Sequence, residues 1–147
     1  MRAILFRGKR INNGKWLEGF LVIWGDDYFI APVIDAYTSM GGRGKGHCLL
    51  FGKYYEVDKN SIGQYTGLTD KNSRKIFEGD ILYFPYYDYA CRVVWDECAF
   101  RVKIAGDYDL YYLSDYIVGG KICGEVIGNT HDSPELFGNP EQLEVDE

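Results

Sequence analysis

The sequence predicts a mainly β protein that is built from several antiparallel hairpins and contains little helix. Aromatic residues make up 16% of the 147 residues, and 13 of them are tyrosines, a composition that favours strands. The chain also contains 18 glycines, which together with the aromatic residues favours strands and turns over helices. The two halves of 91–105 alternate apolar and polar residues with a period of two, which is the pattern of a half-buried strand.

The first part of the chain predicts a meander of three strands. Residues 3–10 and 15–25 form a hairpin around "NNG" at 12–14, because Asn-Gly tolerates the positive φ angles of a tight turn. A second turn at 26–27 leads into a third strand over 28–34.

A glycine-rich segment interrupts this pattern at 38–47. It has four glycines in the six residues 41–46, and we predict a long loop because ordering glycine costs more entropy than ordering any other residue. An apolar, strand-like pattern resumes over 48–57. Residues 58–62 then make either a turn or a short helical bend.

The stretch "GQYTGLTDKNSRKIFEGDIL" (63–82) combines two strand patterns with a polar turn. Residues 63–68 predict a strand, and 69–75 a turn in which Asp70 and Asn72 bond to nearby backbone groups. The apolar strand over 76–84 contains Gly79 between two acids, which predicts a bulge or sharp bend. The second of these acids, at position 80, is expected to accept a hydrogen bond from a nearby N–H.

Residues 91–105 form the clearest hairpin, with its turn at Asp96–Ala99. The segment 109–120 is either a strand or a short helix, and 121–129 is a late strand. In 131–137, Ser133 as N-cap and Pro134 at the first helical position predict one helical turn. We therefore expect a single β domain over 1–131, with possible subregions 1–62 and 63–131, followed over 132–147 by this turn and an acidic tail.

The net charge of −6 is distributed unevenly along the chain. Residues 1–75 carry a net +5, residues 76–131 a net −5, and residues 132–147 a net −6. An acidic protein is a poor non-specific nucleic-acid binder, because that affinity comes from cations that displace phosphate counterions. The opposed charges favour a protein partner or head-to-tail self-association, and the basic first part leaves nucleic-acid binding as the alternative.

No segment indicates membrane insertion or secretion. No apolar run approaches the roughly 20 residues that a membrane helix needs, and the first apolar stretch is too short for a secretion signal. We therefore expect a cytoplasmic protein that does not bind membranes.

The sequence contains no catalytic constellation, metal-site spacing or cofactor motif, so we expect a protein that is not an enzyme. Its four cysteines form no CxxC pair and are expected to be ordinary thiols. Neither His47 nor His131 has a local signature for nucleophilic catalysis, although a pairing of either histidine with Cys91 or Cys123 in the fold stays open.

The candidate binding surface comes from two kinds of segment. The glycine loop carries cations that can reach a phosphate, and its alternative interpretation is a plain hairpin tip. Two tyrosine clusters supply contact area at low entropic cost, and the alternative is a sheet that uses Tyr on half-exposed faces. The residues singled out are Arg43, Lys45, His47, Tyr86, Tyr87, Tyr89, Tyr111 and Tyr112.

Three segments in order resemble YopX-like phage proteins: "FRGKRINNGKWLEGFL" (6–21), the stretch 63–82 quoted above, and "EVIGNTHDSPEL" (125–136). Ser73 departs from the pattern, which usually has a turn glycine there, and so does Glu97-Cys98, where a glycine is common. The resemblance implies a bacteriophage or prophage origin and a β fold with an SH3-like barrel element in the second half. It implies no catalytic residue.

Overall fold

The computed structural model describes residues 3–32, 36–39, 48–51 and 53–137. Contacts divide the chain into two compact units, Ala3–Gln64 and Tyr65–Glu147. The boundary lies two residues after the one predicted between the subregions. Across the described ranges the elements are β-strands and short 3-10 turns with no α-helix, and none of the helical turns is long and apolar enough to span a membrane.

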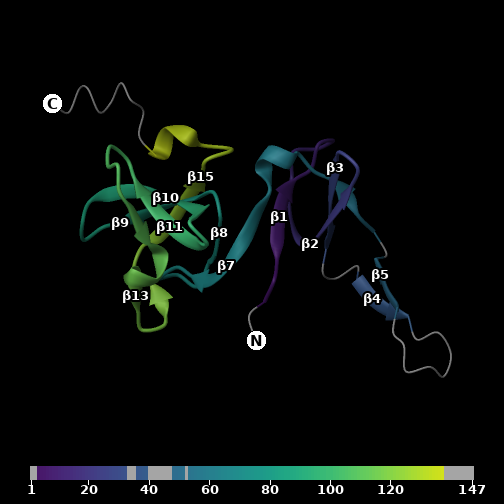
Figure 1. Cartoon of the computed structure of the whole chain (residues 1–147), viewed down its shortest axis with the longest axis horizontal. Coiled ribbons are helices and arrows are strands. Elements are labelled where there is room, and N and C mark those ends of the chain that lie inside the picture. The colour runs from purple at the N-terminus through teal and green to yellow at the C-terminus, as the bar shows by residue number, and fades with distance from the viewer. Residues whose placement is uncertain (1–2, 33–35, 40–47, 52, 138–147) are drawn as a thin grey trace. The chain divides into compact units, whose positions relative to one another are not determined.

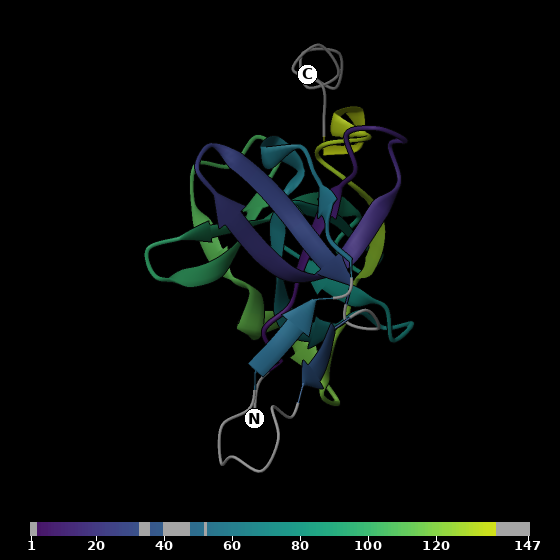
Figure 2. The ribbon, with the colours of Figure 1, turned by 90° about the vertical axis from the view of Figure 1, so that its right-hand side faces the viewer.

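The first unit contains an antiparallel sheet in the order β6-β3-β2-β1-β7 (Figure 1). Its strands are β1 (Phe6–Lys9), β2 (Trp16–Trp24), β3 (Asp27–Pro32), β6 (Tyr55–Glu56) and β7 (Gly63–Thr69). Only the first two residues of β7 pair with β1, and the rest of that strand belongs to the second unit. The predicted three-stranded meander is confirmed, and Figure 2 shows its long β2–β3 hairpin facing the viewer.

The predicted turn at 26–27 is wrong by one residue. The turn comprises Gly25 and Asp26, because Gly25 adopts φ +63° and Asp27 already begins β3 by pairing with Trp24. In the turn between β1 and β2, Gly14 adopts φ +68°, as the "NNG" pattern predicts.

A separate hairpin of the first unit joins β4 (Ala36–Ser39) to β5 (Cys48–Phe51). The loop predicted over 38–47 is therefore too long at its start, because Thr38 and Ser39 pair with Leu49 and Cys48. The remainder of that predicted loop, 40–47, lies outside the described residues.

The strand predicted over 48–57 is divided into β5 and β6. The 3-10 turn η2 (Lys59–Ser61) confirms the bend predicted at 58–62. Asp58 caps this turn by accepting a hydrogen bond from the Asn60 N–H at 3.0 Å, so a local side-chain contact starts the turn.

The second unit contains a five-stranded antiparallel sheet in the order β12-β11-β10-β9-β15 (Figure 1). The strands are β9 (Asp80–Phe84), β10 (Tyr89–Asp96), β11 (Ala99–Ile104), β12 (Leu110–Tyr112) and β15 (Glu125–Asn129). The β10–β11 hairpin is the one predicted at 91–105, and its tight turn places two residues at positive φ, as type I′ turns require.

Shorter elements complete the second unit. They are β8 (Lys75–Phe77), which pairs with β7, the 3-10 turn η3 (Leu113–Tyr116), the small hairpin of β13 (Ile117–Val118) and β14 (Lys121–Ile122), and the 3-10 turn η4 (Pro134–Phe137). Both alternatives for the segment after residue 109 are thus correct in part, because it contains strand and helical turn in succession. The late strand predicted at 121–129 is two strands, and the helical turn begins at Pro134 as predicted.

The sheet of the second unit buries its own core. Alternating side chains of β9, β10 and β11 supply Leu82, Phe84, Cys91, Val93 and Val102, all at most 1% exposed. The outer strands β12 and β15 do not pair with each other, and no closed barrel is detected in the described residues. The mainly β fold of antiparallel sheets is thus confirmed, and the SH3-like barrel element implied by the resemblance stays a prediction.

Candidate functional site

Three tyrosines of the β9–β10 connection form a ladder that leads from solvent into the sheet. The Tyr86 and Tyr87 rings lie edge to face with their centroids 5.0 Å apart. The Tyr87 and Tyr89 rings are stacked, with centroids 5.3 Å apart and an angle of 20° between the ring planes. Tyr86 is 91% exposed and Tyr87 52% exposed. We call Tyr86, Tyr87 and Tyr89 the tyrosine ladder.

The inner end of the ladder is fixed to the core. The ring of Tyr89 lies 5.8 Å from that of buried Phe84, and the Tyr89 and Tyr116 hydroxyls are 3.3 Å apart. Burial and this hydrogen bond raise the pKa of Tyr89 above the ordinary value of a tyrosine hydroxyl, which is already neutral at physiological pH. The ladder therefore presents uncharged aromatic surface on a rigid base.

The loop that carries the ladder is tightly closed. The Asp88 N–H donates to the Phe84 carbonyl at 2.8 Å, and Asp88 adopts φ +54°. The Asp88 carboxylate accepts a hydrogen bond from the Tyr83 hydroxyl at 2.7 Å, which raises the pKa of Tyr83. Because these contacts already fix the backbone, a partner that binds here has less loop entropy to remove.

The other predicted tyrosines lie apart from the ladder, on edge strand β12. Tyr111 pairs with Val102 and donates its hydroxyl to Asp107 at 2.8 Å. Tyr112, the next residue, points to the opposite face, where the Arg101 guanidinium lies 3.9 Å from its ring. Alternation along a strand thus separates two side chains that the sequence places together.

The predicted cations of the glycine loop, Arg43, Lys45 and His47, lie outside the described residues.

The acid Asp70 in the stretch 63–82 is structural. Its side chain is 1% exposed, and one carboxylate oxygen accepts from the Asn72 and Arg74 N–H groups, both at 2.8 Å. The other oxygen accepts from the Val126 N–H of β15 at 2.9 Å. The predicted local turn contact is confirmed, and the bond to a strand 56 residues away could not be read from a local pattern.

Asp80 has a similar role at the predicted bend. It accepts the Phe77 N–H at 2.7 Å, as expected, and Gly79 adopts φ +92°. The Gly79 N–H donates to the Val93 carbonyl, and its own carbonyl accepts the Thr130 N–H, both at 2.8 Å. The bend therefore joins β10 to the segment that follows β15.

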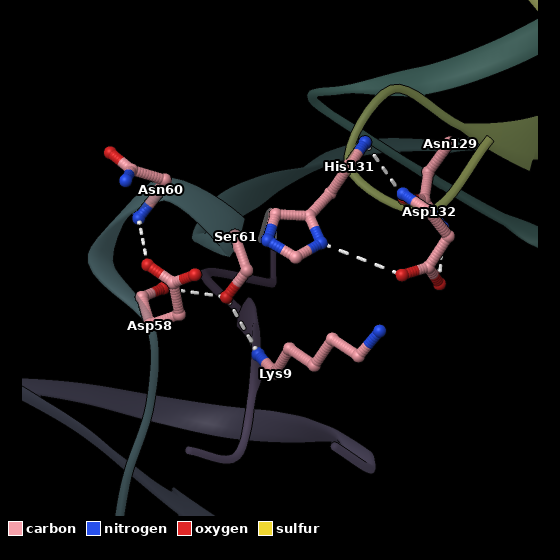
Figure 3. A network of polar contacts seen from close by, with 7 residues as sticks. All are labelled: Lys9, Asp58, Asn60, Ser61, Asn129, His131 and Asp132. Atoms are coloured by element: carbon pink, nitrogen blue, oxygen red, sulfur yellow. Dashed lines mark hydrogen bonds and ion pairs between the residues drawn. The ribbon is translucent and has the colours of Figure 1, made fainter. Parts of the chain in front are cut away.

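The described histidine and a turn serine each belong to a local network (Figure 3). In the second unit, Asn129 Oδ1 accepts the N–H groups of His131 and Asp132, and the His131 Nδ1 atom lies 3.5 Å from the Asp132 carboxylate. In the first unit, the Ser61 hydroxyl donates to the Asp58 carbonyl at 2.6 Å and accepts the Lys9 N–H at 2.8 Å. The second-unit network satisfies the backbone of its own turn, and the first-unit network also joins the turn η2 to strand β1.

The described thiols are Cys91, which is buried, and Cys98 and Cys123, which are exposed, and all three are free. Burial raises the pKa of Cys91 to about 12, so this thiol is not a nucleophile at neutral pH. Among the described residues, no three His, Cys, Asp or Glu side chains cluster closely enough to hold a metal ion.

The first unit has a groove of about 230 Å³ that the sequence reasoning missed. The Arg10 guanidinium lies 4.1 Å from the Tyr55 ring, and the two segments join through a bridge between Arg10 and Val57. Only this long-range pairing brings "RIN" (10–12) beside "YYE" (54–56), so no local pattern marks the site. We call it the Arg10 groove, and its lining residues are Arg10, Ile11, Asn12, Tyr54, Tyr55 and Glu56.

Comparison with known proteins supports the family resemblance and the fold. A family model described as YopX protein matches residues 42–138. The crystal structure of protein EF1440 from Enterococcus faecalis is similar with a TM-score of 0.62 and 23% sequence identity, covering 93% of this chain and 99% of that one. No curated protein matches.

Proposed function

The chain belongs to the YopX family, and we propose that it is a bacteriophage or prophage accessory protein that binds a protein partner or a second copy of itself. The observation that carries this proposal is the tyrosine ladder, which exposes aromatic surface on a rigid base. Exposed, preorganised tyrosines are typical of the residues that contribute most binding free energy at interfaces. We place the protein in the cytoplasm of the bacterial host.

Charge supports an oriented contact. Residues 3–64 of the first unit have 8 basic and 6 acidic residues, a net +2, and the second unit, which includes Arg2, has 8 basic and 16 acidic residues, a net −8. The positive first unit of a second copy, or a basic partner, is attracted to the negative second unit, which also carries the tyrosine ladder. Salt should therefore weaken the association.

Light scattering after size-exclusion chromatography, at low and high salt, tests self-association. Tyr86→Ala combined with Tyr87→Ala should weaken a dimer by about tenfold or more, because both rings lose their contact area. Tyr108→Ala is the matched control, since Tyr108 is 99% exposed and lies outside the ladder.

If the wild type is monomeric at both salt concentrations, capture from host lysate tests a foreign partner. Wild-type protein and the ladder variant are compared side by side. Capture of the same proteins by both, together with a monomeric wild type, would remove the proposal.

We infer a non-enzymatic role. Its support is that Asp70 and Asp80 bond to backbone N–H groups, while Asn129 and Asp132 contact His131 within a turn. Turnover of a generic ester or phosphodiester that is abolished by His131→Ala would contradict this inference.

The second candidate function is nucleic-acid binding, and the cation–aromatic pairs of the first unit favour it. Arg7 and Lys9 lie 5.0 Å and 5.9 Å from the Trp16 ring, and Arg10 lies on Tyr55. Cations interleaved with aromatic rings are what single-stranded nucleic acids contact. Electrophoretic mobility shifts with single-stranded and duplex DNA at low salt test it, and no shift with either would exclude it.

A further inference from the structure

We propose that the Arg10 groove binds one nucleotide unit, either as a free nucleotide or within a single strand. This site rests on the second candidate function and is independent of the tyrosine ladder. The groove is smaller than the roughly 300–1,000 Å³ of drug-sized pockets, so it suits one planar group and not a large ligand.

The backbone that forms the groove is already in place. The Ile11 N–H donates to the Glu56 carbonyl at 3.1 Å, and the Arg10 N–H donates to the Lys15 carbonyl at 2.8 Å. The Gly14 N–H closes the turn on the Arg10 carbonyl at 3.0 Å. A ligand therefore meets a preformed site, and little binding free energy is lost to ordering the chain.

Arg10 supplies the charge for a phosphate. Its guanidinium lies on the Tyr55 ring, and within the described part of the chain no carboxylate lies at ion-pair distance from it. A guanidinium that stacks on an aromatic ring keeps its planar fork of N–H donors, which matches a phosphate in two-point contact.

The remaining lining residues suit a base. Tyr54 is 61% exposed, and its ring is oriented edge to face by Phe29 at 5.5 Å, which leaves an aromatic surface for stacking. Asn12 offers an amide donor and acceptor to a base edge. Glu56 accepts from base amino groups and repels phosphate, so the phosphate belongs at the Arg10 side.

Fluorescence anisotropy at low salt tests the proposal, with a short labelled oligothymidylate as the strand probe and unlabelled AMP and GMP as competitors. Arg10→Ala and Tyr54→Ala should each weaken binding by about tenfold. Arg10→Lys keeps the charge but loses the planar fork, and should fall between wild type and Arg10→Ala. Lys59→Ala is the charge-matched control, since exposed Lys59 does not line the groove.

The outcomes separate this site from the function on which it rests. Competition by a mononucleotide identifies the free nucleotide as a ligand. Strand binding that no mononucleotide competes with identifies the single strand as the ligand. Either result supports the site if Arg10→Ala weakens binding. Strand binding that Arg10→Ala and Tyr54→Ala leave unchanged would overturn the groove and keep the nucleic-acid function. No binding of either probe would overturn both the groove site and the nucleic-acid function. Circular dichroism of each variant verifies that it is folded.

Discussion

At the scale of single residues, the acids of the family stretch act as backbone acceptors. Asp70 accepts three N–H groups with one buried carboxylate, so its charge is compensated without any cation. Such charge-assisted bonds are among the stronger hydrogen bonds in proteins. A buried carboxylate that accepts three backbone N–H groups stabilises the fold and is not placed to act as an acid or base.

Asp70→Asn should lower the free energy of unfolding by about 2–4 kcal/mol, because an amide N–H₂ replaces one acceptor and faces buried N–H donors. Urea denaturation measures this change. Asp109→Asn removes the same charge from an exposed side chain and should stay within about 0.5 kcal/mol of wild type. Equal effects of the two substitutions would contradict the role of Asp70.

Ser73 stands in a turn where the pattern of YopX-like proteins is expected to have a glycine. Its φ is +67°, a region that costs a side chain of this kind energy and costs glycine little. Ser73→Gly should therefore stabilise the protein by about 0.5–1 kcal/mol, partly offset by the lost exposed hydrogen bond from Lys121 Nζ. Ser73→Ala, which loses the same hydroxyl but keeps the Cβ atom, is the control. Ser73→Gly melting below Ser73→Ala would refute the explanation.

The buried thiol of Cys91 makes stability depend on pH in the alkaline range. Its pKa rises from 9.0 to about 12 on folding, so above pH 9 the unfolded chain loses a proton that the folded chain keeps. Stability must then fall as pH rises from 9 toward 12, by at most about 1.4 kcal/mol per pH unit from this group. Urea unfolding across this range should show a smaller fall for Cys91→Val than for wild type. Parallel pH profiles would contradict the assignment.

At the scale of elements, local chemistry determined what could be predicted. The first turn of the meander, the bend at Gly79 and the β10–β11 hairpin follow from glycine, Asn, Asp and period-two patterns, whereas the second turn lies one residue before its predicted place. Features that depend on distant pairing were missed: the Asp70–Val126 bond, the Arg10 groove and the separation of the tyrosine clusters. Strand register over long separations has no local signature, and these contacts depend on it.

The β2–β3 hairpin depends on a glycine in mid-strand. A Cβ atom at Gly19 would collide with the Ala31 carbonyl oxygen across the hairpin, so no larger residue fits without moving the backbone. Gly19→Ala should cost more than about 2 kcal/mol in urea unfolding. Gly25→Ala, at φ +63° in open space, should cost only about 1 kcal/mol. A smaller loss for Gly19→Ala than for Gly25→Ala would be inconsistent with this packing.

At the scale of the whole molecule, each unit has its own tryptophan reporters. Trp16 and Trp24 lie in the first unit and Trp95 in the second. The main core cluster comes entirely from second-unit residues, from Leu68 to Val126. The second unit therefore has a core that is complete without the first, as independent folding units do.

Gly19→Ala should thus shift the two units unequally. In a Trp95→Phe background, the remaining tryptophan fluorescence reports the first unit, and the midpoint of its urea unfolding curve should fall. With Trp16→Phe and Trp24→Phe, the signal of Trp95 should keep its midpoint within error. Equal shifts of both midpoints would show that the units unfold as one.

The contacts around Asp70 and Gly79 also set the order in which the chain can be assembled. The Lys71 N–H donates to the Gly124 carbonyl, the Val126 N–H to the Asp70 carboxylate and the Thr130 N–H to the Gly79 carbonyl. These bonds of residues 70–79 therefore form only after the last strand, β15, and the residue that follows it are available. A nascent chain on the ribosome cannot complete this sheet until roughly residue 130 has left the exit tunnel. Until then, the edge of β9 that later receives β15 stays unpaired, which is the state in which a chaperone or a neighbouring chain has access to it.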